Sequence, residues 1–377
     1  MRLDACPSLT QRWDALGRPF AHLPRWAAGL VLALLAGAMG WSVLATAPGD
    51  QPERAPVTAA PATSPNPLDR AKGDMALYAR IAARVTAGEG YYAAAMDEQR
   101  ASNYPTRPFV AVRLPTLALL QALIGVDGVR YAQLALVLAC LWALNRRETP
   151  LAAWPERLGA SVLLALGGAA ALNPVAGLDQ DFSAGLCLTL ALLLYRRARW
   201  WPALLAAALA LAVRELAAPF VLLWLAFALA EQRWREAGAV AALLALFAGG
   251  MALHFAAVEA GRLPGDLASQ GWSALAGYRL PLSALAHLTG LRLLPVALAA
   301  PLAILPLIGW AAIRGRIGVF ALLWFAGLFT MMALFARPEN FYWVQLALPA
   351  YGIGLAFAPR GLFELFQGAA GRASRQT

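Results

Sequence analysis

The sequence is poor in charged residues. Only 14% of its 377 residues are Asp, Glu, Lys or Arg, whereas 60% are hydrophobic and the mean hydropathy is +0.58. A soluble domain carries about a quarter charged residues, so this chain cannot cover its surface with polar groups. The remaining charges cluster between long apolar runs, which is typical of a chain whose main solvent is lipid.

Cysteine, histidine and the common cofactor motifs are also scarce. Cys140 and Cys187 lie inside apolar runs, which argues against a disulfide framework. The lone histidines His254 and His287 favour packing over metal ligation, and no closely spaced His, Cys or Asp cluster indicates zinc. P-loop, dinucleotide and Gly-x-Ser-x-Gly motifs are absent, so nucleotide chemistry has no support. The sequence predicts no cofactor and leaves a divalent metal open without indicating one.

Apolar runs predict an all-α polytopic membrane protein with about ten transmembrane helices. The first run, residues 26–46, is followed by an Ala-Thr-Ala sequence that could mark signal-peptide cleavage. Its length suits a retained span, and Pro48 would follow the cut, so we favour a span. The run 109–125 is ambiguous between a span and an interfacial or re-entrant segment. The later predicted spans are residues 131–145, 158–172, 182–195, 201–213, 216–230, 237–257, 291–313, 317–336 and 341–357.

Residues 47–130 are predicted to form a long outer loop with its own helices. Its first part is rich in Pro, Ala and Thr, which is typical of a flexible tether. Further on, Tyr78, Ile81 and Val85 follow helical spacing, which predicts an amphipathic helix, and a second short helix is predicted at residues 93–102. The remaining predicted parts are an inner tail at 1–25, the first span at 26–46, a helical bundle at 131–358 and an inner tail at 359–377.

Arginine counts predict an orientation. With both termini in the cytoplasm and the run 109–125 not crossing, the inner segments hold 17 of the 31 basic residues and seven of the 21 acidic ones. The inner side then carries the whole net charge of +10, which needs no nucleic-acid partner. A single lysine, Lys72, and abundant Ala and Arg are typical of a GC-rich bacterial genome. We therefore expect a multi-pass protein of the bacterial plasma (inner) membrane.

This orientation gathers the unexplained polar residues on the non-cytoplasmic side. Charged residues at membrane depth are costly and usually mark a pathway or a site. Arg214 and Glu215 lie between two short apolar runs, where they form either a solvated hairpin apex or the wall of a water-filled cavity. Asp179 and Asp181 are open between turn solvation and a site. The Tyr-Trp pair at 342–343 is best explained as an interfacial anchor.

Several motifs together suggest a family. The first outer loop opens with Gly-Asp-Met-Ala-Leu-Tyr at residues 73–78 and continues through Gly-Glu-Gly-Tyr-Tyr at 88–92 and Arg-Leu-Pro-Thr at 113–116. With the Asp181 turn and the Arg214-Glu215 pair, this order resembles the GT-C superfamily of membrane glycosyltransferases, which use polyprenyl-phosphate sugars as donors. The likeness covers most of the chain as an architecture. One departure is the short length, which leaves no room for a soluble C-terminal domain.

The resemblance implies transfer of a sugar, with inversion, from a polyprenyl-phosphate donor to a lipid or glycan acceptor. Asp74 matches the family's acidic residue at the reaction centre, where a carboxylate accepts the proton of the acceptor hydroxyl. The alternative for Asp74 is an exposed helix N-cap. Arginines would stabilise the departing lipid phosphate. The residues expected to bind substrate are Tyr78, Arg107, Arg113, Asp179, Asp181, Arg214, Glu215 and Arg337.

Other classes of function stay open at this stage. A transporter or flippase usually shows internal repeats and polar sites near mid-membrane, and no convincing repeat is present. A non-catalytic assembly factor for lipid-linked glycans would explain the composition but not the long helical loop. A polymer ligase would handle the same donor. Convergence of Asp74, Arg214 and the turn after Arg337 in one cavity would favour transfer chemistry, whereas a channel open to both sides would favour transport.

Overall fold

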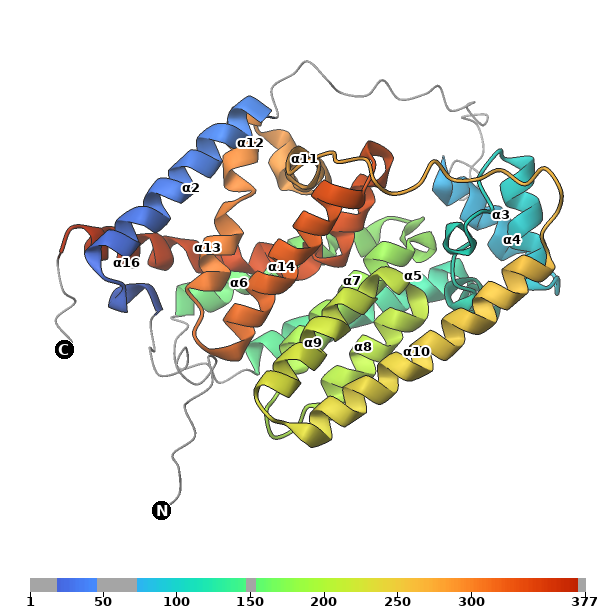
Figure 1. The fold of residues 1–377 in the computed structure, drawn as a ribbon, viewed down its shortest axis with the longest axis horizontal. Coiled ribbons are helices and arrows are strands. Elements are labelled where there is room, and N and C mark those ends of the chain that lie inside the picture. Colours follow the sequence, from blue (N-terminus) through green and yellow to red (C-terminus); the bar gives the residue numbers. More distant parts are fainter. Residues whose placement is uncertain (1–18, 46–72, 147–153, 372–377) are drawn as a thin grey trace.

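The computed structural model describes residues 19–45, 73–146 and 154–371, and within these ranges every regular element is a helix (Figure 1). The all-helical prediction is therefore confirmed for this part of the chain. The predicted tether and most of the inner N-terminal tail lie outside the described residues. Four segments are long and apolar enough to cross a membrane: α2 (Arg25–Ala45), Phe109–Asn145, α10 (Trp234–Ala260) and α14 (Gly315–Phe335).

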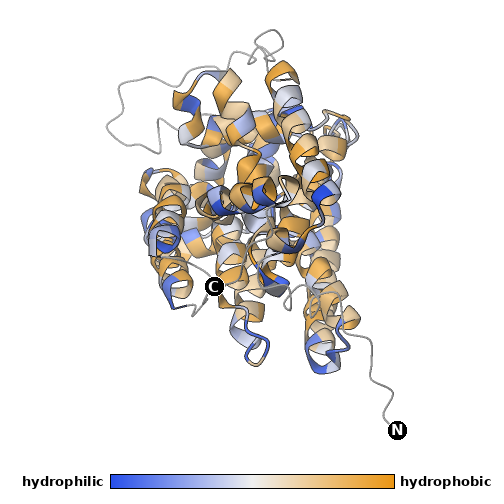
Figure 2. Cartoon of the chain, turned by 90° about the vertical axis from the view of Figure 1, so that its left-hand side faces the viewer, coloured by the Kyte–Doolittle hydropathy of each residue, from blue (hydrophilic) through white to orange (hydrophobic). Residues whose placement is uncertain are grey.

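Four further apolar helices coincide with predicted spans but are short. They are α6 (Trp154–Gly168), α7 (Gln180–Leu194), α8 (Trp201–Val213) and α9 (Ala218–Ala230). A helix needs about 20 residues to cross the hydrocarbon core, so these four do not establish spans by length, and the count of ten stays a prediction. Hydrophobic residues cover most of the visible helices (Figure 2), and leucines such as Leu246 and Leu253 of α10 are largely exposed.

The last part of the chain departs from two predicted spans. The run 291–313 is broken into η6 (Gly290–Leu293), α12 (Val296–Leu302) and α13 (Leu305–Ala311), and the run 341–357 into η7 (Pro338–Leu346), α15 (Leu348–Tyr351) and η8 (Gly352–Ala356). The first run contains Pro295, Pro301 and Pro306, and the second contains Pro349. Each proline removes a backbone donor and crowds the preceding turn, which explains the short pieces. The helix α16 (Ala358–Ala369) follows and packs against α2.

The two helices predicted in residues 47–130 are present as α3 (Asp74–Thr86) and α4 (Tyr91–Ala101). Their apolar faces bury Leu77, Ile81 and Met96 against each other and against residues near α5. Polar contacts hold the outer side, including Arg80 Nε to Glu98 Oε2 at 2.8 Å. This pair of helices forms a compact unit beside the start of α5 and the far end of α10 (Figure 1).

Gly125 divides α5 (Thr116–Asn145) into two parts, because its φ of 77° and ψ of 163° are not helical. The run 109–125, predicted as a separate segment, therefore ends at this break. Two buried glutamines, one on each side of Gly125, bind the turn before α7. Gln121 Nε2 donates to Gly177 O at 2.7 Å, and Gln133 Nε2 donates to Ala176 O at 2.8 Å. The turn carrying Asp179 and Asp181 is thus fixed to the break. Whether residues 109–125 cross a membrane stays a prediction.

The two ends of the bundle hold different polar groups. α7 begins at Gln180, among the predicted outer residues, and ends at Leu194, next to Tyr195. Because an α-helix rises about 1.5 Å per residue, the two ends of α7 lie in different parts of the bundle. Around Tyr195, Glu236 pairs with Arg233 at 2.7 Å and with Arg316 at 3.3 Å, and it accepts a bond from Trp224. The three charged groups come from segments predicted to lie on the inner side, and the structure brings them together.

Candidate functional site

An open cavity of about 890 Å³ lies where α3, α4, the start of α5, the α8–α9 turn and η7 meet. Six of the nine predicted site residues line it, and they come from four parts of the chain that are distant in sequence. These six are Asp74, Tyr78, Arg113, Arg214, Glu215 and Arg337. The convergence of Asp74, Arg214 and the turn after Arg337, which separates the classes of function considered above, is therefore present.

Asp74 is the first residue of α3, and its side chain is held from outside the helix. The N-cap is Gly73, whose φ of 59° suits a residue without a side chain, so the N-cap alternative for Asp74 is wrong. Tyr104 Oη donates to Asp74 Oδ1 over 2.7 Å. Burial of this phenol and the adjacent Asp74 raise the pKa of Tyr104 above its ordinary value, so the hydroxyl stays a donor.

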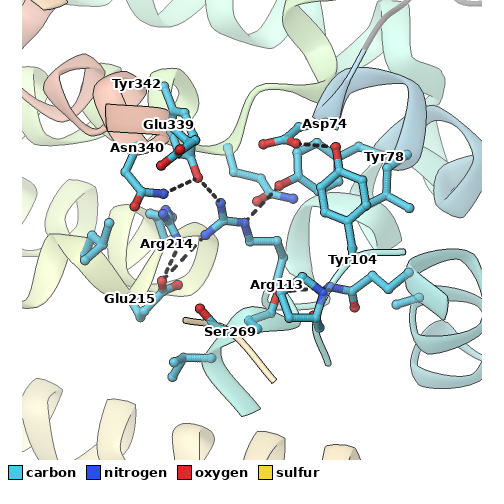
Figure 3. Close-up of a pocket in the computed structure, with 18 of the residues that line it drawn as sticks. Asp74, Tyr78, Tyr104, Arg113, Arg214, Glu215, Ser269, Glu339, Asn340 and Tyr342 are labelled. Atoms are coloured by element: carbon cyan, nitrogen blue, oxygen red, sulfur yellow. Dashed lines mark hydrogen bonds and ion pairs between the residues drawn. The ribbon is translucent and has the colours of Figure 1, made fainter. Parts of the chain in front are cut away.

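Arg113 lies at the centre of the polar network (Figure 3). Its Nε donates to Tyr78 Oη and its Nη2 to Tyr342 Oη, each over 3.0 Å. Its Nη1 lies 3.9 Å from Glu215 Oε1. Two of its three neighbours are neutral phenols, so the guanidinium keeps much of its positive charge for a ligand.

Arg214 is held more tightly than Arg113. Its Nε lies 2.8 Å from Asp181 Oδ1, its Nη1 contacts Glu215, and its side chain is only 1% exposed. The apex between α8 and α9 is therefore not a solvated hairpin, because a buried guanidinium sits between two carboxylates. The guanidinium is thus paired on both sides, and this matters because a buried cation costs a great deal unless it is paired. Asp181 lies behind Arg214, outside the cavity lining.

The segment after α14 supplies a further part of the cavity wall. Arg337 Nη1 contacts Gln270, a neutral amide, and among the residues described no carboxylate lies within ion-pair distance of Arg337. Asn340 Nδ2 donates to Tyr342 Oη over 3.1 Å. Tyr342 and the buried Trp343 both line the cavity. The interfacial-anchor interpretation of this pair is therefore corrected, because Tyr342 serves the network around Arg113.

Arg107 and Asp179 do not line the cavity. Arg107 Nη2 donates to the main-chain oxygen of Asp266 over 2.6 Å, which attaches the loop after α10 to the loop after α4. Asp179 caps α7 by accepting from Phe182 N over 2.9 Å. Burial, together with the neighbouring Asp181, raises the pKa of Asp179 to about 6. Both residues lie near the site without facing the cavity.

Several lining residues escaped the sequence reasoning. Tyr104 is separated from Asp74 by 30 positions, and no local pattern relates the two. Ser269, Gln270 and Trp272 line the cavity and belong to the loop between α10 and α11 (Arg279–Leu288). Glycines in this loop indicate turns, but they do not indicate where the loop lies. Its attachment to residues 106–107 appears only in three dimensions.

Within the described ranges, no three His, Cys, Asp or Glu side chains come close enough together to hold a metal ion. Comparisons with protein-family models, curated proteins and solved structures found no match to this chain. The chemistry of the cavity is therefore argued from its own geometry. The cavity joins a hydrogen-bonded carboxylate, two arginines with mostly neutral partners and several phenol and amide groups.

Proposed function

We propose that this chain is a membrane glycosyltransferase that moves a sugar from a polyprenyl-phosphate donor to a hydroxyl of a lipid or glycan acceptor on the non-cytoplasmic face. The observation that carries the proposal is the convergence of Asp74 with Arg113 and Arg337 in one open cavity. Two of the segments long and apolar enough to cross a membrane, Phe109–Asn145 and α14, contribute residues to the lining of this cavity. A lipid-linked anionic donor needs both a polar cavity for its sugar phosphate and an apolar surface for its lipid chain.

The reaction uses the carboxylate of Asp74 and the arginines that line the cavity. Asp74 accepts the proton of the acceptor hydroxyl as its oxygen attacks the anomeric carbon. The bond from that carbon to the donor phosphate breaks with inversion, through a state that resembles an oxocarbenium ion. Polyprenyl phosphate leaves with the bonding electron pair. Arginine stabilises the departing phosphate with planar, bidentate donors.

The arginines differ in their suitability for the phosphate. Arg214 is engaged by Asp181 and Glu215, so its charge is largely compensated. Arg113 and Arg337 donate mainly to neutral oxygens. We therefore assign the phosphate to Arg113 and Arg337, and we assign to Arg214 the role of holding Glu215 and the α8–α9 turn in place.

The proposal is tested by sugar transfer in membranes that contain the wild-type protein, Asp74→Asn or Asp127→Asn, with radiolabelled polyprenyl-phosphate sugars and endogenous acceptors. Asp127 is a matched control, because its side chain is 71% exposed and lies outside the cavity lining. We expect Asp74→Asn to lose about 10²-fold or more of the activity, as removal of a general base does. Asp127→Asn should retain it.

Two outcomes would contradict the proposal. Equal transfer by the wild type and Asp74→Asn would remove Asp74 from the mechanism. No transfer by the wild type, with donor and acceptor both shown to be present, would remove the enzyme class. Movement of the lipid-linked sugar between bilayer leaflets, measured in vesicles that contain the same protein, would then identify a flippase.

A further inference from the structure

Three consecutive main-chain carbonyl groups just before α5 are each held by a side chain from another element. Two of these side chains belong to α4, and the third belongs to the membrane-length helix α10. The pairs are Gln99 Nε2 to Ala111 O at 3.1 Å, His254 Nε2 to Val112 O at 3.1 Å and Tyr91 Oη to Arg113 O at 2.6 Å.

The backbone at residues 111–113 makes little regular structure of its own. The segment η2 (Phe109–Ala111) is one short 3-10 turn, and α5 begins only at Thr116. A buried carbonyl needs a donor, and here the donors are side chains. Since each bond orients one peptide plane, three successive bonds fix the position from which the Arg113 side chain starts.

We propose that Tyr91, Gln99 and His254 are positioning residues that set the Arg113 guanidinium in the cavity. His254 shows the point most clearly, because it lies outside the cavity lining and acts on Val112, the residue before Arg113. The guanidinium then reaches Tyr78 and Tyr342. The importance of this positioning for catalysis rests on the proposed function, but the positioning of Arg113 itself does not.

Both ring nitrogens of His254 have hydrogen-bond partners. Val112 O can only accept a hydrogen bond, so the proton must be on Nε2. In the neutral imidazole Nδ1 then accepts from Tyr92 Oη at 3.1 Å. The rings of Tyr92 and Phe109 pack against the imidazole, with centroids 5.6 and 5.8 Å away. Glutamine places an amide near the position of Nε2, whereas asparagine is too short to reach Val112 O. Comparing these two substitutions therefore distinguishes loss of the hydrogen bond to Val112 O from loss of the imidazole ring itself.

The first test measures the position of residue 113 without any substrate. Arg113→Cys is placed in a background with alanine at positions 6, 140 and 187, and its labelling rate by a water-soluble thiol reagent is measured. We expect Tyr91→Phe and His254→Asn to change this rate by about two- to tenfold, as the loss of one hydrogen bond does. His254→Gln should restore the parent rate.

Tyr351→Phe is the matched control for Tyr91→Phe. Tyr351 is also buried, and its hydroxyl also donates to a main-chain carbonyl over 2.6 Å, that of Ala303, away from the cavity. Its removal should leave the labelling rate at position 113 unchanged. Equal rates in the parent and Tyr91→Phe, or equal changes for Tyr91→Phe and Tyr351→Phe, would overturn the proposal.

The second test asks whether Tyr91 acts through Arg113. We expect Tyr91→Phe to lower kcat/KM for sugar transfer by about two- to tenfold in the Arg113 protein and to have no further effect in Arg113→Ala. Multiplied losses in the double variant would show independent roles and overturn the proposal. If the wild type transfers no sugar, the proposed function fails, and the labelling experiment still decides whether these residues position Arg113.

Discussion

Tyr104 Oη donates to Asp74 Oδ1 over 2.7 Å, which joins the loop after α4 to the first residue of α3. We predict that Tyr104→Phe lowers kcat for sugar transfer by about tenfold while the donor KM changes little, because the carboxylate loses one orienting bond. Tyr131→Phe, at an exposed position of α5, serves as the control in the same steady-state assay. A change confined to the donor KM would contradict an effect on Asp74.

Two arginines that line the cavity, Arg337 and Arg214, should respond differently to substitution. Arg337→Gln removes a charge that has a neutral partner, so we expect the donor KM to rise about tenfold with unchanged stability. Arg214→Gln leaves the buried Asp181 without its cation, which should lower the free energy of unfolding by about 3 to 5 kcal/mol. Transfer kinetics and thermal unfolding in detergent measure the two effects. Equal destabilisation by both variants would contradict this assignment.

The attachment of the loop after α10 should depend on pH. Asp266 is bonded by Arg100 Nε at 2.7 Å and by Leu263 N at 3.1 Å, and these donors hold its pKa below the ordinary value. A lowered pKa contributes stability above the unfolded pKa of about 3.9, and this stability is lost as the pH falls through the folded pKa.

We therefore predict that Asp266→Asn lowers the free energy of unfolding by about 1 to 3 kcal/mol at neutral pH. The gap between wild type and variant should narrow as the pH falls below about 4. Thermal unfolding across this range, with limited proteolysis of the loop as a local readout, measures the gap. A gap that stays constant to acidic pH would rule out the ion pair as its source.

Two glycine-to-alanine substitutions should change stability in opposite directions. A Cβ at Gly309 would lie 1.6 Å from Gly354 O, so α13 and η8 would have to separate. A Cβ at Gly249, within α10, meets nothing within 4 Å. We expect Gly309→Ala to destabilise by several kcal/mol and Gly249→Ala to stabilise by roughly 0.5 to 1 kcal/mol. Thermal unfolding of both variants is the measurement, and an unchanged midpoint for Gly309→Ala would disprove the close approach.

The sequence predicted local helices well because their signal is local. The spacing of Tyr78, Ile81 and Val85 identified α3, and the glycines after it marked its end. In the runs 291–313 and 341–357 the prediction from the sequence was less successful, because prolines interrupt the helices there. Hydrophobicity alone predicted two spans there, but the missing backbone donors produced short pieces.

The candidate site could be predicted only in part. Charges are rare in an apolar chain, and this identified five of the charged residues that line the cavity, although it missed Glu339. Tyr104 and Tyr342 gave no such signal, since aromatic residues are common at membrane interfaces. Their roles arise from contacts between distant segments, as between Arg113 and Tyr342. A single sequence does not encode such pairings in any readable spacing.

The bend in α5 is controlled from outside the helix. Gln121 and Gln133 are twelve positions apart, on opposite sides of Gly125, yet they bind carbonyls of adjacent residues. A change in the angle between the two parts of α5 would move one of these amides relative to the other. Both amides bind the same short turn, so at least one of the two hydrogen bonds would break. The turn before α7 therefore fixes the angle between the two parts of α5, and Gly125 only permits the backbone conformation that this angle requires.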